Sequence, residues 1–252
     1  MQTAPIGFFD SGLGGISVLR EALLRYPAED YLYYGDNGNA PYGEKTLEQT
    51  RALVDDAVAA LLACGIKALV IACNTATSAS AERLRARLDI PVIGMEPALK
   101  PAAMLRHGGQ VLVLATPLTL KLEKFQRLME RYGEGVTPLP APELVTLAEA
   151  GCLEGPRVDE ALARITKDVG GQVDGVVLGC THYSLMRGAV QAFFGNDVFI
   201  VDGNAGTVAQ MARLLAARGE LRPSSGIGSV KLITTGDEAA IAPLFWQLLQ
   251  AQ

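Results

Sequence analysis

Short apolar runs alternate along the chain with longer segments in which apolar positions recur at helical spacing. The runs are rich in Val, Ile, Leu and Phe and carry few polar interruptions, as strands buried on both faces of a parallel sheet do. This alternation predicts βαβ units and therefore the α/β fold class. Strands are predicted at 4–9, 30–34, 67–72, 91–94, 110–115, 174–179, 197–201 and 229–234.

Two segments between these strands have a clear amphipathic helical pattern. In 46–64 one apolar face is formed by Leu53, Ala57, Ala60, Leu61 and Cys64, and Gly65 supplies the stop signal. The last helix repeats the pattern with Ile241, Leu244, Phe245, Leu248 and Leu249. Loops are short and contain Gly, Pro, Asn and Asp, which fits an α/β protein.

A weak similarity between two segments of the chain suggests that the fold has two halves. LVIACNTATS at 69–78 and VVLGCTHYSL at 176–185 both lead from an apolar strand through a Cys into a polar helix start. If the fold is duplicated, the two Cys-bearing strand ends occupy equivalent places and face each other across a cleft. Ten residues do not establish duplication, because a strand that ends before a polar helix start is common in α/β proteins.

Composition narrows the classes of function. The chain has 252 residues, 49% hydrophobic and 19% charged, which excludes disorder, collagen and coiled coil. The net charge of -5 is spread without runs, so neither nucleic acid nor an anionic membrane is an expected partner. No apolar stretch approaches the roughly 18 residues of a membrane span. We expect a soluble, cytoplasmic protein.

The cysteines give no sign of a disulfide framework or a zinc site. Cys64, Cys73, Cys152 and Cys180 form no CxxC pair, so no metal is expected. Cys64 lies on the predicted apolar helix face and Cys152 has no polar surroundings, and both are expected to be inert. The other two thiols lie among polar motifs.

Two polar loops follow the first two predicted strands. FFDSGLGG at 8–15 contains Asp10 and Ser11 before a glycine-rich turn, but it lacks the Lys of a phosphate loop and the spacing of a dinucleotide site. These two residues either cap the following helix or contact a ligand at the carboxyl end of the sheet. YYGDNGNAPYGEKT at 33–46 is either a set of turns or a lid over a small polar ligand.

The motifs ACNTAT at 72–77 and GCTHYS at 179–184 each place a thiol between a strand and a helix. The positive end of a helix dipole lowers the pKa of such a thiol from about 8.5, so Cys73 and Cys180 are candidate bases or nucleophiles. His182 near Cys180 raises the alternative of a cysteine hydrolase. That alternative leaves Cys73 without a role, and neighbouring side chains at a helix start point apart. His107 is expected to be a solvated cation.

Two thiols that face each other suggest a different reaction. One acid and one base on opposite faces of a stereogenic carbon invert its configuration without a cofactor. Cys73 and Cys180 would exchange the proton. The polar residues Asp10, Ser11, Asn74, Thr75 and Thr181 would hold a small zwitterion.

The motifs FDSGLGG, APYGEKT, ACNTAT and GCTHYSL, in this order, closely resemble those of the glutamate racemase family of peptidoglycan precursor synthesis. The resemblance spans residues 6–215. It implies two pseudo-symmetric α/β domains, 1–97 plus 207–252 and 98–206, with the active site in the cleft between them. It also implies glutamate as substrate, no cofactor, no metal, and a homodimer.

The resemblance also implies a role for each matching residue. Cys73 would deprotonate D-glutamate and Cys180 L-glutamate, and Asp10, His182 and Glu149 would assist. The substrate-binding set would be Asp10, Ser11, Pro41, Tyr42, Gly43, Asn74, Thr75, Thr181 and His182, with Ser11, Tyr42 and Gly43 near the side-chain carboxylate.

Some positions depart from the family pattern, and two other functions stay open. Ser184 stands where the family generally has Pro, and Phe125 replaces a common Tyr. An aspartate or hydantoin racemase would share the two thiols but differ in the substrate-end loops, and APYGEKT favours glutamate. A catalytically silent amino-acid-binding relative would have no need of both thiols.

Overall fold

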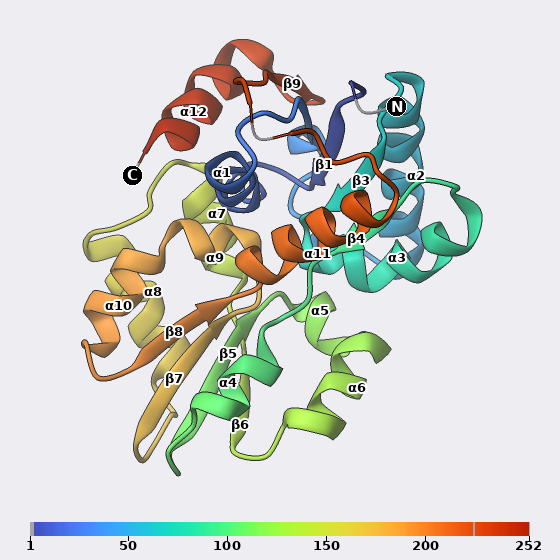
Figure 1. Ribbon diagram of the computed structural model, residues 1–252. Coiled ribbons are helices and arrows are strands. Elements are labelled where there is room, and N and C mark those ends of the chain that lie inside the picture. Colours follow the sequence, from blue (N-terminus) through green and yellow to red (C-terminus); the bar gives the residue numbers. More distant parts are fainter. Residues whose placement is uncertain (1–2, 224, 252) are drawn as a thin grey trace.

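The protein is built on two parallel β-sheets that lie one above the other in Figure 1. The computed structural model describes residues 3–223 and 225–251. The first sheet has the order β4-β3-β1-β2-β9 and the second β6-β5-β7-β8. Their strands are β1 Ile6–Asp10, β2 Tyr31–Gly35, β3 Ala68–Ile71, β4 Val92–Gly94, β5 Gln110–Ala115, β6 Val136–Pro140, β7 Val173–Leu178, β8 Phe199–Asp202 and β9 Val230–Thr234.

Helices cover both faces of each sheet, which confirms the predicted α/β class with two parallel sheets. The first sheet is flanked by α1 Ile16–Arg25, α11 Asn204–Ala217 and α12 Glu238–Gln250 on one face and by α2 Leu47–Ala63 and α3 Asn74–Arg87 on the other. On the second sheet α7 Pro142–Glu149, α8 Pro156–Thr166, α9 Thr181–Leu185 and α10 Arg187–Phe194 lie opposite α4 Leu99–Leu105 and α6 Glu123–Tyr132. Shorter helical turns are η1 Asn37–Asn39, η2 Tyr42–Glu44 and α5 Pro117–Lys121.

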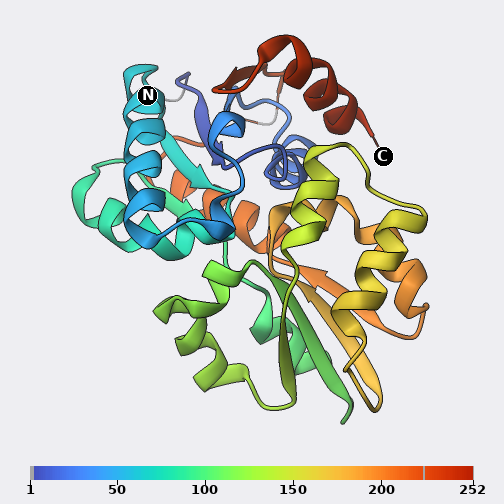
Figure 2. The same ribbon diagram turned by 180° about the vertical axis from the view of Figure 1, so that it is seen from behind.

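The chain passes to the second sheet after β4 and returns to the first after β8. On its return α11 packs against α1, β3 and β4, and β9 then pairs with β2 at the edge of the first sheet. The view from behind in Figure 2 shows the same two sheets, one above the other. Sequence segments from both ends of the chain therefore belong to the same sheet.

All eight predicted strands are confirmed, but the sequence pattern missed β6. Its sequence, Val136–Pro140, contains two prolines, which cannot donate to a strand ladder. The structure places β6 at the edge of its sheet, where only one side needs pairing. A proline-containing strand at an edge does not have the apolar run by which the other strands were predicted.

The predicted helix at 46–64 exists, but its buried face is rotated by part of a turn from the predicted one. The buried positions are Thr50, Val54, Ala57, Val58 and Leu61. Cys64 is the C-cap residue and is exposed, so its predicted burial is also wrong. Alanines populate both sides of this helix, which makes its apolar pattern ambiguous. Thr46 begins the helix with a capping box to Gln49.

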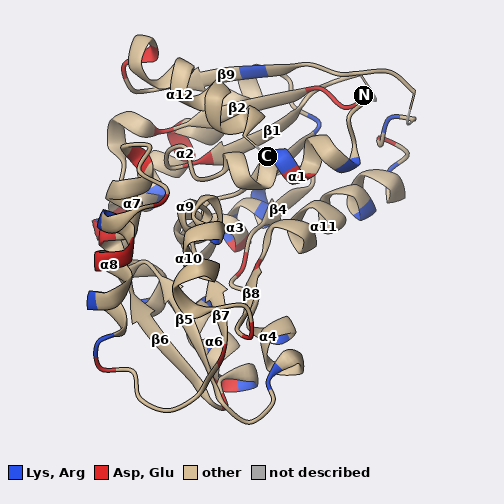
Figure 3. Ribbon diagram, turned by 90° about the vertical axis from the view of Figure 1, so that its left-hand side faces the viewer, with Lys and Arg blue, Asp and Glu red and all other residues tan. Residues whose placement is uncertain are grey.

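The carboxyl ends of both sheets point toward one another. Helix α1 contacts α9, η2 contacts α5, and α3 contacts both α5 and α6. Charged residues lie mostly on the outer helices and loops, whereas the strands are largely free of them (Figure 3). Within the described residues, no helix has both the length and the apolar character needed to cross a membrane.

A buried ion pair stabilises the opposite, amino end of the first sheet. The Nζ atom of Lys67 lies 2.6 Å from Oε2 of Glu29, with both side chains at most 1% exposed. Lys67 also donates to the carbonyl of Glu220, and Glu29 accepts from the backbone N–H of Arg222. The pair therefore joins the starts of β2 and β3 to the segment that follows α11.

We predict that Glu29→Ala lowers the free energy of unfolding by about 3–5 kcal/mol, because it leaves the Lys67 ammonium buried without its carboxylate. Urea denaturation measures this change. Glu21→Ala is the control, since it breaks the exposed pair with Arg25 and is expected to have little effect. Similar losses in both variants would contradict a special role for the buried pair.

Candidate active site

The two sequence-predicted thiols lie at the carboxyl ends of the two sheets. Cys73 follows β3 and is the N-cap residue of α3, and Cys180 follows β7 and is the N-cap residue of α9. Both are buried, at 5% and 7% exposure. The predicted position of each thiol between a strand and a helix is confirmed.

Cys180 is the end of a chain of polar contacts that crosses between the sheets. Its Sγ lies 3.6 Å from Nδ1 of His182, so the expectation that these side chains point apart is wrong. The Nε2 atom of His182 lies 2.5 Å from Oε1 of Glu149, at the end of α7. Glu149 also accepts from the backbone N–H of Leu13 at 2.7 Å and from Nδ2 of Asn37 at 3.1 Å. Both of these donors belong to loops of the first sheet.

The contacts of His182 and Glu149 decide their charge. Burial acts to lower the pKa of His182, but hydrogen bonds to Cys180 and Glu149 outweigh it and raise the pKa well above its ordinary value. Burial acts to raise the pKa of Glu149, yet its bond to His182 and the charge of that ring bring it below its ordinary value. The pair is therefore an imidazolium and a carboxylate, and Nδ1–H donates toward the sulfur of Cys180.

Cys73 has different partners. Its Sγ lies 3.6 Å from Oγ of Ser11 and accepts from the backbone N–H of Ala76 at 3.4 Å. Burial and then the charge of Asp10 raise the pKa of Cys73 to about 12. The expected lowering by the helix dipole is thus wrong for this thiol, because desolvation outweighs it. The charge of Cys180 adds a smaller rise to the pKa of Cys73.

Asp10 lies at the junction of the two sheets. Its Oδ1 accepts from the hydroxyl of Thr181 at 3.1 Å and its Oδ2 from the backbone N–H of Gly12 at 3.0 Å. The side chain is fully buried, and burial raises its pKa while the charge of His182 opposes the rise. Asp10 and Thr181, predicted from separate motifs, are in direct contact.

The glycine-rich turn after β1 is explained by close approach rather than by phosphate binding. A Cβ at Gly12 would lie 2.0 Å from Oε1 of Glu149, and a Cβ at Gly14 would lie 2.5 Å from Oγ1 of Thr181 and 2.6 Å from the backbone N of His182. Glycine therefore allows the start of α9 and the end of α7 to pack directly on this turn.

The predicted substrate loop packs across the boundary between the sheets. Tyr42 is buried, and its hydroxyl donates to Oδ2 of Asp36 at 2.5 Å. A Cβ at Gly43 would meet the side chain of Thr116 at 2.5 Å. Pro41 is partly exposed beside them. The loop is thus an ordered wall near the site, and the Tyr42 hydroxyl is already engaged by protein.

The first residues of α3 bring two more predicted residues into the site. Asn74 is 2% exposed, and neither its Nδ2 nor its Oδ1 has a hydrogen-bond partner among the described residues. The hydroxyl of Thr75 lies 2.9 Å from that of Thr116 and 3.0 Å from that of Thr119, and these last two also contact each other.

Thr116 and Thr119 were missed by sequence reasoning. Their signal was the junction of β5 with α5, where Thr116 caps the helix ahead of Pro117. This is a third strand end that leads into a helix with polar side chains.

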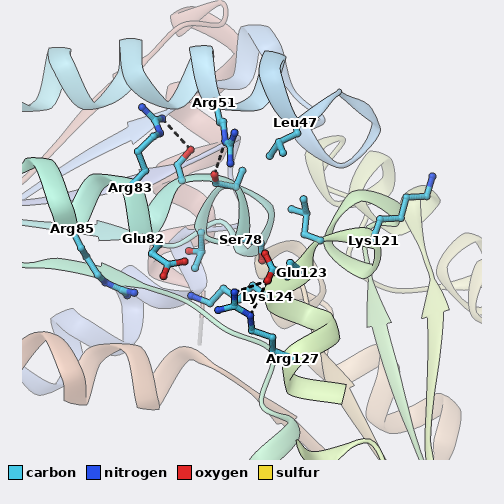
Figure 4. Close-up of a pocket in the computed structure, with 14 residues that line it drawn as sticks. Leu47, Arg51, Ser78, Glu82, Arg83, Arg85, Lys121, Glu123, Lys124 and Arg127 are labelled. Atoms are coloured by element: carbon cyan, nitrogen blue, oxygen red, sulfur yellow. Dashed lines mark hydrogen bonds and ion pairs between the residues drawn. The ribbon is translucent and has the colours of Figure 1, made fainter. Parts of the chain in front are cut away.

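A separate cavity of about 770 Å³ lies between α2–α3 and α5–α6 (Figure 4). It is lined by Leu47, Arg51, Thr77, Ser78, Ala79, Ser80, Glu82, Arg83, Arg85, Lys121, Leu122, Glu123, Lys124 and Arg127, none of which is a predicted site residue. Arg83 pairs with Asp55, Arg127 with Glu123, and Arg51 donates to the carbonyl of Ala79. These three cations already have protein partners, and because no lining residue belongs to the thiol site, the cavity is distinct from that site.

Comparisons with known proteins agree with this geometry. Residues 17–211 match the family model described as Asp/Glu/Hydantoin racemase. The glutamate racemase of Clostridium perfringens (strain ATCC 13124) is 46% identical over 254 residues, covering 99% of this chain and 98% of the relative.

Two solved structures have the same fold over almost their full lengths. The structure of glutamate racemase from Thermus thermophilus in complex with beta-chloro-D-alanine is 33% identical, with a TM-score of 0.81 over 99% of this chain and 94% of that one. The structure of Escherichia coli glutamate racemase in complex with L-glutamate and activator UDP-MurNAc-ala is 32% identical, with a TM-score of 0.84 over 97% and 95%.

The two-sheet fold and these matches define the class: the protein is an amino-acid racemase, an isomerase. Within that class, the chain belongs to the Asp/Glu/Hydantoin racemase family. Among the described residues, no three His, Cys, Asp or Glu side chains are grouped as a metal site would require.

We predict that Gly14→Ala lowers the free energy of unfolding by about 1–3 kcal/mol, because the added methyl group overpacks the contact with Thr181 and His182. Racemase activity is expected to fall as well. Gly188→Ala in α10 is the matched control, since its Cβ meets nothing within 4 Å and it is expected to keep or slightly raise stability. Urea denaturation and activity assays measure both variants, and equal behaviour would contradict the close-approach argument.

The raised pKa of Cys73 predicts its reactivity. Because only the thiolate is alkylated, the rate of iodoacetamide labelling at Cys73 should rise about tenfold per pH unit from pH ~7 to ~10, without the plateau of an ordinary thiol near its pKa of about 8.5. Peptide mass spectrometry follows Cys73 and the exposed Cys64 in the same sample. A plateau at Cys73 near pH ~9 would show that burial does not control this thiol.

Proposed function

We propose that this racemase interconverts L-glutamate and D-glutamate by moving the α-proton between Cys73 and Cys180 without a cofactor. The observation that carries the proposal is the pair of buried thiols, one at the carboxyl end of a strand of each sheet, with these ends of the two sheets joined by the bond from Thr181 to Asp10. An acid on one face of a stereogenic carbon and a base on the other invert its configuration. Similarity to glutamate racemases over nearly the whole chain supports glutamate as substrate.

The different surroundings of the two thiols favour different roles with L-glutamate. In this scheme the sulfur of Cys180, opposite the His182 imidazolium, is the base: it takes the α-proton and leaves the electron pair on the α-carbon. The Cys73 thiol, which its raised pKa keeps protonated at neutral pH, donates a proton to the other face. With D-glutamate the two thiols exchange roles. In this scheme Asp10 assists Cys73, and His182, held by Glu149, assists Cys180.

The weak acidity of the α-proton requires stabilisation of the charge that develops on the α-carboxylate. We assign the amino-acid head to Asn74, Thr75 and Thr181, beside the N–H groups that begin α3. The buried amide of Asn74, which has no partner among residues 3–223 and 225–251, supports this assignment, because buried polar groups normally find a partner and a bound zwitterion supplies one.

We assign the second carboxylate of the substrate to the first-sheet loops, with Ser11, Pro41, Tyr42 and Gly43 nearby. A site built for that carboxylate rejects glutamine and alanine, whose binding leaves buried donors unpaired. A kcat/KM for aspartate comparable with that for glutamate would instead favour an aspartate racemase of the same family.

The burial of both thiols requires movement for substrate entry. We propose that the sheets mark two domains, residues 1–97 plus 207–252 and 98–206, which separate to admit glutamate and close over it. The contacts that would open are those of Asp10 with Thr181 and of Glu149 with Leu13. Closure would exclude water and strengthen each polar contact with the substrate.

The physiological role follows from the product. We propose that D-glutamate made by this protein supplies peptidoglycan synthesis. Assembly as a homodimer and a cytoplasmic location stay predictions.

We predict that Cys73→Ser and Cys180→Ser each lower kcat for glutamate racemisation by a factor of about 10² to 10⁴ or more, because each removes a positioned acid–base group. Circular dichroism follows optical inversion, and NMR in deuterated buffer follows exchange of the α-proton. Cys152→Ser is the control, since that thiol is partly exposed and donates to the backbone carbonyl of Glu154 rather than to a predicted site residue. Near wild-type turnover in both directions by either site variant would refute the two-thiol scheme.

A further inference from the structure

A line of three hydrogen bonds connects the carboxyl end of β9 to the carboxylate of Glu149. The backbone N–H of Gly236 donates to Oγ1 of Thr234 at 3.1 Å, and Thr234 donates to Oδ1 of Asn37 at 2.9 Å. Nδ2 of Asn37 then donates to Oε2 of Glu149 at 3.1 Å. Gly236 and Thr234 lie outside the motifs of the site, and Asn37 belongs to the polar loop at 33–46 but is not among the predicted site residues.

The carboxylate of Glu149 fixes which way the Asn37 amide faces, because an ionised carboxylate only accepts and must therefore receive the NH₂ group. The hydroxyl of Thr234 accepts from Gly236 and donates its proton to the Asn37 oxygen, which holds the amide in that orientation. An amide in the opposite orientation would set its oxygen against the carboxylate and lose the bond to Glu149.

Resting on the two-thiol racemisation proposed above, we propose that Asn37 is a positioning residue for proton transfer at Cys180. By holding Oε2 of Glu149, it fixes the carboxylate plane so that Oε1 receives Nε2–H of His182. The opposite ring atom, Nδ1, is then directed at the Cys180 sulfur. Asn37 acts through two intervening side chains.

The line serves one thiol and not the other. Cys73 takes its contacts from Ser11 and Ala76, which have no recorded bond to Asn37 or Glu149 in the described chain. Loss of the Asn37 amide should therefore slow the proton transfers of Cys180 while leaving those of Cys73 unchanged. This asymmetry separates positioning from a general structural role.

The test uses Asn37→Ala, which removes the amide, and Thr234→Val, which keeps the shape of that side chain but removes the hydroxyl that orients it. The control is Gln172→Ala, which removes a comparable amide-to-carboxylate bond, from Gln172 to Asp174, at the amino end of β7. Circular dichroism and urea midpoints establish that each variant is folded. Thr234→Val carries the test by itself if Asn37→Ala does not fold.

We predict that Asn37→Ala lowers kcat/KM about tenfold, the effect expected for a lost hydrogen bond to a charged group. The fall must be equal in both directions, because the equilibrium between enantiomers fixes the ratio. The double variant with Thr234→Val should be little worse than Asn37→Ala, since both changes act on one line. Gln172→Ala should retain wild-type kcat/KM.

The decisive readout is the primary kinetic isotope effect with α-deuterated L- and D-glutamate. If Cys180 has become slow, removal of deuterium from L-glutamate limits the rate more fully and that isotope effect rises. With D-glutamate the deuterium leaves to Cys73 and the slow step moves to reprotonation by Cys180, so that isotope effect falls. Opposite shifts in Asn37→Ala and Thr234→Val, absent from Gln172→Ala, support the proposal.

Other outcomes overturn it. Isotope effects that stay constant or move in the same direction show that Asn37 has no selective action at Cys180, even where turnover falls. An unchanged kcat/KM shows that the line has no catalytic effect. Failure of the wild-type protein to racemise glutamate would instead refute the proposed function itself, so the two failures are distinguishable.

Discussion

The carboxylate of Glu149 is the centre on which the geometry of the site depends. It projects from the end of α7, on the second sheet, and accepts hydrogen bonds from Leu13 and Asn37 of the first sheet as well as from His182. A mostly buried carboxylate needs such donors, because an unpaired charge is costly to desolvate. Gly12 approaches this carboxylate closely and Gly14 approaches Thr181 and His182, so a larger residue at either position would hold the sheets apart.

The two thiols resemble each other in backbone position but not in chemistry. Burial and the charge of Asp10 keep Cys73 protonated, and they outweigh the hydrogen bonds from the Ser11 hydroxyl and the Ala76 N–H, which favour the thiolate. Cys180 faces an imidazolium held by a carboxylate. The same event, burial at a strand end, therefore gives one thiol that holds its proton and another opposite a cation. The two-thiol racemisation proposed above needs such a pair, a proton donor on one side and a base on the other, at the start of each turnover.

The sequence predicted what depends on local pattern. Apolar runs located eight strands, and the polar residues after them located both thiols at strand ends. It failed where tertiary context decides. The prolines of β6 are tolerated only because that strand is at an edge, and the buried face of α2 depends on which side meets the sheet. The orientation of His182 toward Cys180 depends on Glu149, which is itself held by the backbone N–H of Leu13, 136 positions away in the sequence. The desolvation of Cys73 likewise depends on how the folded chain packs around it.

The three-hydroxyl contact of Thr75 with Thr116 and Thr119 has a consequence for how such proteins diverge. Thr75 comes from the first sheet, whereas Thr116 and Thr119 come from the second. The bonds of Glu149 also join the two sheets, so neither half by itself contains the whole candidate site. A chimaera that combined halves from two relatives would retain both thiols and both hydrophobic cores. Its contacts between the two sheets would nevertheless join residues that do not match. Residues on the two sides of the boundary between the sheets must therefore change together, because a substitution on one side is constrained by its partners on the other.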